Sequence, residues 1–101
     1  MMLHTVNKSP FEKDSLATCI RLSAAGSSIL LLEDGVYGAI KGSNVETAVL
    51  SGLKDRKIYA LCPDLMARGI DRGKLIDGIE VVDYDDFVRL AVEAPKVQSW
   101  L

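Results

Sequence analysis

Residues 28–35 read SILLLEDG, an uninterrupted apolar run that ends in two acidic residues and a glycine. Apolar runs of this kind, without the alternation of a half-exposed strand, are typical of strands covered on both faces of a parallel sheet. The run therefore predicts a central strand over 28–32. We expect Glu33, Asp34 and Gly35 to end that strand at the carboxyl edge of the sheet, where α/β proteins commonly hold their functional groups.

Segments with strand character alternate with segments of helical character along the rest of the chain. Strands are predicted over 3–7, 57–62 and 79–82, with a further short strand in the apolar tail 97–101. Helices are predicted over 10–25, 45–53, 64–68 and 84–93, with one helical turn over 36–40. Asp83 is the expected N-cap of the helix over 84–93, and Pro95 is expected to end it. This alternation indicates right-handed β–α–β units. We expect a single α/β domain over 1–101, a small three-layer sandwich with a mostly parallel sheet of four to five strands, flavodoxin-like or Rossmann-like.

The first predicted helix has signals at both of its ends. Ser9 is a favourable N-cap, Pro10 suits the first helical position, and Glu12 completes an S-x-x-E capping box. Gly26 marks the expected C-terminal end. A helix with these bounds places Cys19 in its third turn, beside the first strand.

The composition argues against several classes of protein. Of the 101 residues, 49% are hydrophobic and 26% charged, which is typical of globular proteins. The net charge of −2 argues against direct binding of nucleic acid through phosphate contacts. No run approaches the roughly 18 apolar residues of a membrane span. The N-terminus lacks the pattern of a signal peptide, so we expect a cytoplasmic protein.

Each of the two cysteines has two possible roles, a reactive one and a structural one. Their spacing is not C-x-x-C, which predicts reduced thiols, and with a single histidine we expect no metal site and no cofactor. Cys19 is either a nucleophile that carries a persulfide or a small buried side chain that faces the sheet. It lies too far along the helix for help from the helix dipole. Cys62 is either a reactive group at the carboxyl end of a strand or a packed one.

The acidic pair Glu33-Asp34 has three interpretations: an acid/base pair, a turn in which Asp34 caps the next helix, or a loop at a protein interface. The interface is favoured, because Val36 and Tyr37 follow as apolar residues that we expect to be exposed. His4, inside the first strand, is expected to be structural. The candidate interface residues are Asp34, Gly35, Val36, Tyr37 and Trp100, the last because a large aromatic beside the C-terminus packs on the domain or on a partner.

Two segments, 3–11 (LHTVNKSPF) and 30–37 (LLLEDGVY), resemble the DsrH/TusB family of small sulfur-relay subunits. Shorter matches follow at 59–61, 64–69, 82–88 and 98–100, so the resemblance covers nearly the whole chain. It implies a DsrEFH-like fold and a heterohexamer with DsrE/TusD-like and DsrF/TusC-like subunits. Such complexes pass persulfide sulfur to a small DsrC/TusE-like acceptor.

The resemblance also implies a role for this chain. The main catalytic cysteine is expected on the DsrE/TusD-like partner, so this subunit would assist assembly within a sulfurtransferase complex. DsrH-type members keep a cysteine at the position of Cys19, which places the chain closer to DsrH. The implied pathways are 2-thiolation of the tRNA wobble uridine and dissimilatory sulfur oxidation, without membrane or direct nucleic-acid contact. The alternative is a standalone sulfurtransferase that uses Cys19 as its nucleophile.

Overall fold

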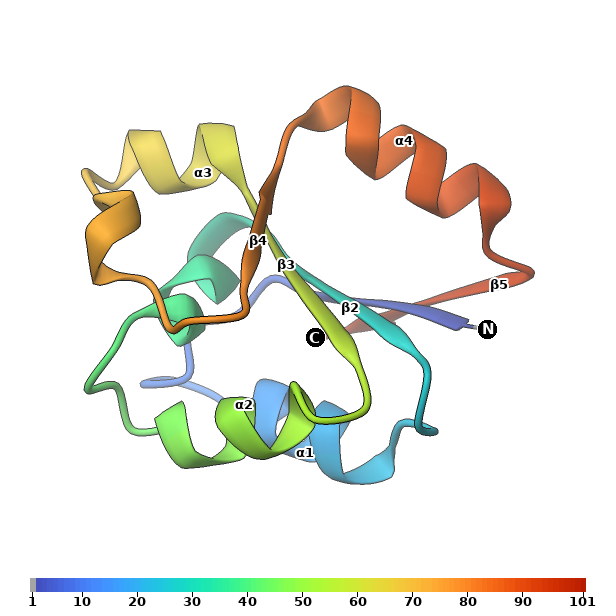
Figure 1. Ribbon diagram of the computed structural model, residues 1–101, viewed down its shortest axis with the longest axis horizontal. Helices are drawn as coiled ribbons and strands as arrows, with labels where there is room; N and C mark the ends of the chain where they lie inside the picture. The colour runs from blue at the N-terminus through green and yellow to red at the C-terminus, as the bar shows by residue number, and fades with distance from the viewer. Residues whose placement is uncertain (1) are drawn as a thin grey trace.

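The computed structural model describes residues 2–101, and its centre is a sheet of five parallel strands in the order β4-β3-β2-β1-β5 (Figure 1). The strands are β1 (Met2–Val6), β2 (Ser28–Leu31), β3 (Lys57–Leu61), β4 (Glu80–Val82) and β5 (Lys96–Trp100). The helices are α1 (Ser15–Leu22), α2 (Glu46–Gly52), α3 (Cys62–Ala67) and α4 (Tyr84–Glu93), with 3-10 helices η1 (Glu33–Ala39) and η2 (Arg72–Lys74). The predicted α/β fold is confirmed, and the apolar tail forms the fifth strand.

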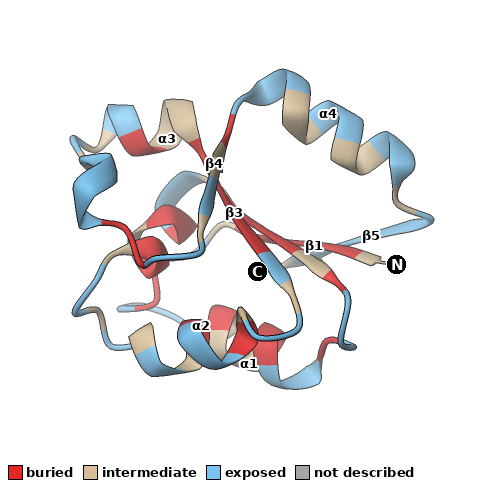
Figure 2. Ribbon diagram, viewed as in Figure 1, coloured by how far each residue is buried: buried red, intermediate tan, exposed pale blue. Residues whose placement is uncertain are grey.

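Side chains alternate along β2 between two apolar cores. Ile29 and Leu31 pack with α1, α2 and η1, whereas Leu30 lies in a smaller core beneath α4. All three side chains are fully buried, so β2 is covered on both faces, as its uninterrupted apolar run predicts. Helices α1 and α2 lie on one side of the sheet and α4 on the other (Figure 1). Figure 2 shows that α4 is the more weakly covered layer, because none of its residues is fully buried.

The strand order creates a switch point at β1. The chain adds strands outward from β1 to β4, then returns to the other side of β1 to form β5. In open α/β sheets, ligands and partners commonly meet the carboxyl ends of strands beside such a point. The segments that follow β1 and β5 therefore occupy a favourable position for function.

The predicted bounds of the first helix are wrong at both ends. Ser9 does cap a turn, since its Oγ accepts from the N–H of Phe11 at 3.1 Å, but that turn does not continue into the helix. Helix α1 begins only at Ser15 and ends at Leu22, four residues before Gly26. Arg56 explains the early end, because its guanidinium donates to the Ser23 carbonyl and, at 2.8 Å, to the Ser23 Oγ. Cys19 consequently lies in the second turn.

Two other elements begin two or more residues before their predicted starts, whereas the remaining predicted bounds differ by at most one residue. The 3-10 helix η1 begins directly at Glu33, three residues before the predicted turn. Helix α3 begins at Cys62 instead of Asp64, with Pro63 in its first turn. Proline is well placed there, because the first N–H groups of a helix have no intrahelical acceptor. Cys62 therefore starts a helix and does not end a strand.

The predicted cap of the last helix is confirmed. The Asp83 side chain accepts from the N–H of Asp86 at 2.8 Å, and the Asp86 side chain accepts from the N–H of Asp83 at 3.2 Å. This reciprocal pair is a capping box. The hydrogen bond from the Asp83 backbone lowers the pKa of Asp86. Pro95 follows the helix and leads into β5, as the sequence indicates.

Candidate functional site at the carboxyl edge of the sheet

A polar network joins the segments that follow β1, β2 and β3. The N–H of Glu33, two residues after the end of β2, donates to Asp64 Oδ2 in α3 at 2.7 Å. Asn7 Nδ2, immediately after β1, donates to Glu33 Oε2 at 3.4 Å. Glu33 has a φ of +50°, a left-handed conformation that non-glycine residues adopt at a cost of about 1 kcal/mol or more. The contacts with Asp64 and Asn7 hold the residue in this conformation.

Arg68 links the same edge to η1. Its Nε donates to Asp34 Oδ1 at 3.0 Å, and its Nη2 lies 2.9 Å from the same oxygen. Its Nη1 also donates to the Asp64 carbonyl at 3.1 Å. Asp34 is therefore one end of an ion pair between η1 and α3, and its side chain remains about half exposed. The sequence singled out Asp34 but gave no sign of Arg68 as its partner.

The expectation that Val36 is exposed is wrong. Val36 is fully buried in the main core, and Gly35 is buried as well. An added Cβ on Gly35 would lie 2.1 Å from the carbonyl oxygen of Val6, so η1 packs directly on the backbone of β1. Tyr37 is half-buried and Asp34 is exposed, so only the polar start of η1 and one aromatic ring reach the surface.

Cys19 lies inside the main core. Its side chain has no exposed surface, and burial raises the pKa of the Cys19 thiol to about 12, with the charge of Arg56 acting in the opposite direction. The thiolate is the nucleophilic form of cysteine, so this environment disfavours nucleophilic chemistry. The geometry agrees with the interpretation of Cys19 as a packed side chain on the sheet-facing side of α1.

Cys62 lies in a different environment, at the start of α3 on the carboxyl edge. Its side chain is half-buried, and Arg72 Nη2 lies 3.8 Å from its Sγ. The two cysteines therefore differ in accessibility, which sequence spacing alone did not reveal.

This difference predicts selective labelling. In the native protein, a maleimide should modify Cys62 and leave Cys19 unmodified, whereas both thiols should react in denaturant. Intact-mass spectrometry over time measures the modification, and a Cys62→Ser variant identifies which thiol has reacted. Labelling of native Cys19 at the rate of Cys62 would contradict its assignment to the core.

Trp100 packs on its own domain at the end of β5. Its Nε1 donates to His4 Nδ1 at 3.0 Å, and the ring lies against the main core. His4 is only 4% exposed, and burial together with the charge of Arg56 lowers its pKa. The structural role expected of His4 fits this contact. The sequence gave no signal for the pair, because the two residues lie 96 positions apart.

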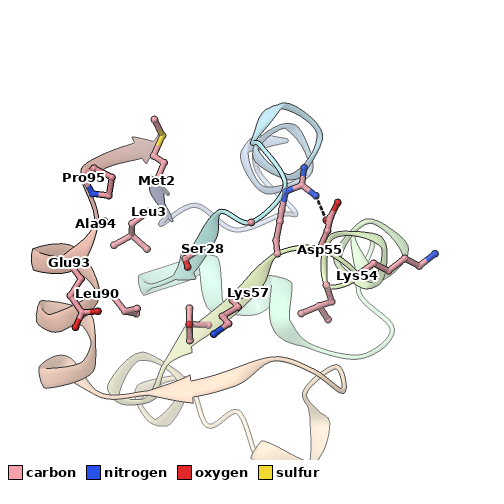
Figure 3. Close-up of a pocket in the computed structure, with 14 residues that line it drawn as sticks. Met2, Leu3, Ser28, Lys54, Asp55, Lys57, Leu90, Glu93, Ala94 and Pro95 are labelled. Carbon is pink, nitrogen blue, oxygen red and sulfur yellow. Dashed lines mark hydrogen bonds and ion pairs between the residues drawn. The ribbon is translucent and has the colours of Figure 1, made fainter.

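A cleft of about 590 Å³ lies at the opposite, amino edge of the sheet (Figure 3). Its walls are the start of β1, the turn before β3 and the end of α4. Arg56, one of its charged residues, pairs with Asp55 at 2.6 Å. None of the two cysteines or the candidate interface residues Asp34, Gly35, Val36, Tyr37 and Trp100 lines this cleft. The network of the carboxyl edge and the cleft are thus separate features.

Among residues 2–101, no group of three or more histidine, cysteine or acidic side chains is arranged to hold a metal ion. None of the helices in that part of the chain has the length and apolar character needed to cross a membrane.

Solved structures of other proteins share this fold. The ychN protein of Escherichia coli superposes with a TM-score of 0.85 at 22% identity, over 98% of this chain and 97% of that one. A protein of unknown function from Methanobacterium thermoautotrophicum gives 0.76 at 19% identity, over 96% of each chain. At such identities the likeness concerns the fold alone: a small α/β domain with one parallel sheet.

Sequence comparison identifies the family. The model of the "DsrH like protein" family matches residues 8–97. Protein TusB of Escherichia coli (strain K12) is 42% identical over 101 residues, which covers 98% of this chain and all of that protein. Protein TusB of Shigella flexneri is 41% identical over the same length. The chain belongs to the DsrH/TusB family, as its opening and its LLLEDGVY segment indicated.

Proposed function

We propose that this chain is a subunit of a sulfur-relay complex that serves 2-thiolation of the tRNA wobble uridine. Membership of the DsrH/TusB family, with curated TusB relatives at 42% identity over nearly the full chain, carries the proposal. Dissimilatory sulfur oxidation is the second pathway open to this family. The prediction that the chain is closer to DsrH than to TusB depended on Cys19, whereas these relatives are TusB proteins.

The subunit's part in the relay is assembly. Cys19 is buried and its thiol has a raised pKa, which fits a core residue better than a sulfur carrier. The partners in this proposal are DsrE/TusD-like and DsrF/TusC-like subunits in a heterohexamer, with a DsrC/TusE-like acceptor, in the cytoplasm. In the transfer step an acceptor thiolate attacks the outer sulfur of the partner's persulfide. A new S–S bond forms, the old one breaks, and the donor cysteine leaves as a thiolate.

The proposed role predicts that sulfur transfer does not depend on Cys19. A reconstituted complex with Cys19→Ala, or with Cys19→Ser, should load the acceptor at a rate within about twofold of wild type. The alanine variant avoids burial of a hydroxyl without a hydrogen-bond partner, which costs about 1–3 kcal/mol in proteins. The mass gain of one sulfur atom on the acceptor measures the transfer.

The control is the carrier cysteine that the proposal assigns to the partner: a serine in its place in the DsrE/TusD-like subunit should abolish transfer. A folded Cys19→Ala complex that assembles normally but fails to load the acceptor would favour the alternative, a sulfurtransferase with Cys19 as nucleophile. Persulfide uptake and delivery by the isolated chain would support the same alternative.

A further inference from the structure

The cleft at the amino edge of the sheet has the make-up of a site for a small molecule. Part of its lining is apolar and comes from β1 and the end of α4, including Leu3, Leu90 and Ala94. Its volume of about 590 Å³ lies in the range of pockets that bury small organic ligands. Such pockets combine apolar walls with a few polar groups that fix the orientation of the ligand. The polar groups of this cleft therefore decide which ligand fits.

The strand register brings three polar side chains together on the floor of the cleft. Ser28 in β2 is the register partner of Lys57 in β3, and neighbouring strands lie about 4.8 Å apart. Tyr59 follows two residues later in β3, so its side chain lies on the same face of the sheet as Lys57. All three residues line the cleft, and Figure 3 shows Lys57 extending from β3 toward α4. Two hydroxyls and one ammonium group can thus donate hydrogen bonds there.

The hydroxyl of Tyr59 lacks the partner that a buried tyrosine usually has. Tyr59 is only 7% exposed, and buried polar groups of this kind are normally hydrogen-bonded. Within residues 2–101 no group bonds to the Tyr59 hydroxyl, yet this oxygen is not closed off from solvent. The same is true of the Ser28 hydroxyl. Because both residues line the cleft, the open space that their hydroxyls reach is the cleft itself.

The charged groups of the cleft set the sign of its ligand. Asp55 and Arg56 pair with each other at 2.6 Å, so neither charge is left for a ligand. Among residues 2–101, no carboxylate lies within ion-pair distance of Lys57. Glu93 is also unpaired, but it lies on α4, across the cleft from Lys57, and Lys54 extends away from the floor (Figure 3). An anionic group is therefore attracted to the β3 side and repelled from the α4 side.

We propose that this cleft binds a small organic anion with an apolar body, of the class of a medium-chain carboxylate. The carboxylate accepts hydrogen bonds from Ser28, Lys57 and Tyr59 on the β3 side. The apolar chain lies over Leu3 and Leu90, toward α4. This site goes beyond the proposed relay function and does not rest on it, because the cleft lies at the edge of the sheet opposite the polar network.

Three probes with the same chain and different head groups test the sign of the ligand charge. Octanoate is an anion, octanol is neutral, and octylammonium is a cation at neutral pH. Proton–nitrogen correlation spectra of the full chain, recorded during a titration with each probe at millimolar concentration, measure both affinity and location. Octanoate should shift the amides of residues 26–28, 54–57 and 93–94. It should bind about tenfold more tightly than octanol, and octylammonium should bind more weakly than either.

Two variants test the assigned contacts. Lys57→Gln removes the charge and Tyr59→Phe removes only the hydroxyl, and each should weaken octanoate binding about tenfold. Tyr59→Phe should leave the free energy of unfolding unchanged, because the hydroxyl has no partner to lose. The matched control is Lys13→Gln, which changes the net charge equally at an exposed residue that does not line the cleft. It should bind octanoate as wild type does.

The other outcomes overturn the proposal. If octanoate shifts none of the cleft amides, the cleft holds only water. If octylammonium binds as tightly as octanoate, Glu93 and not Lys57 selects the ligand, and the assigned class is wrong. Octanoate affinity that Lys57→Gln or Tyr59→Phe leaves unchanged would contradict the proposed contacts. Circular dichroism before and after heating establishes that each variant is folded.

Discussion

Replacing Gly35 with alanine is expected to lower the free energy of unfolding by about 3 kcal/mol, through overpacking against the backbone. The added Cβ would lie 2.1 Å from the Val6 carbonyl oxygen and 2.9 Å from its carbonyl carbon. Neither atom can move without shifting β1, the strand that pairs with both β2 and β5. In a domain of this size the loss corresponds to a fall in Tm of about 15 °C, which thermal and urea unfolding measure.

Gly73 provides the matched control. It also lies in a 3-10 helix, but no atom outside its immediate chain neighbours lies within 4 Å of the position of an added Cβ. We expect Gly73→Ala to change stability by less than about 1 kcal/mol, with stabilisation as the direction that backbone entropy favours. Equal losses at Gly35 and Gly73 would show that the close approach of η1 to β1 does not limit stability.

Replacing Trp100 with alanine is expected to cost about 2–3 kcal/mol, less than a fully buried tryptophan because the ring is only half-buried. The change removes apolar contacts with the main core and leaves His4 Nδ1 without its donor. It also removes a side-chain anchor of β5, the edge strand next to β1. Urea unfolding measures the loss, and hydrogen exchange of β5 amides reports whether the strand separates first.

The burial of His4, together with the charge of Arg56, makes stability depend on pH. The pKa of His4 is lowered from 6.5 in the folded protein, so the unfolded chain binds the proton more readily. Stability from this group is therefore fully present above pH 6.5 and is lost as the pH falls through the folded pKa. A protonated His4 also has no acceptor for the Trp100 N–H, because both ring nitrogens then carry hydrogen.

Two variants isolate this effect. His4→Asn keeps an acceptor oxygen near the position of Nδ1 but does not titrate, so the acid-dependent loss between pH 7.5 and 5 should become smaller than in wild type. Trp100→Phe keeps most of the ring and removes only the donor, so it should destabilise less than alanine. If His4→Asn and wild type lose stability in parallel on acidification, other groups control the pH dependence.

The fold was predictable because its signals are local. The apolar run in β2 and the cap at Asp83 each specify an element within a few residues, and both are confirmed. Helix α1 was less predictable, because its end depends on Arg56, which lies 33 residues from Ser23. The predicted start of α1 was wrong because Ser9 caps an isolated turn, and the hydrogen bonds of this turn resemble those of the first turn of a helix.

The exposed surface at the carboxyl edge of the sheet was only partly predictable. Asp34 was identified as a surface residue by its place after a buried strand, and the structure leaves it exposed. The predicted exposure of Val36 was wrong, because the sequence around an apolar residue does not show whether its side chain packs on the core of its own domain or on a partner. The exposure of Phe11 and Met66 was not predicted, because exposure depends on what packs above a residue and not on its neighbours in the chain.

The sequence by itself determined the α/β fold with its parallel sheet and the membership of the DsrH/TusB family. Hydrophobic periodicity and caps act over a few residues, so the sequence contains them in full. Only the tertiary structure decided that Cys19 is buried, that Arg68 holds Asp34, and that Trp100 donates to His4. Burial, ion pairing and pKa depend on groups that folding brings together from distant parts of the chain, and no local pattern encodes those distances.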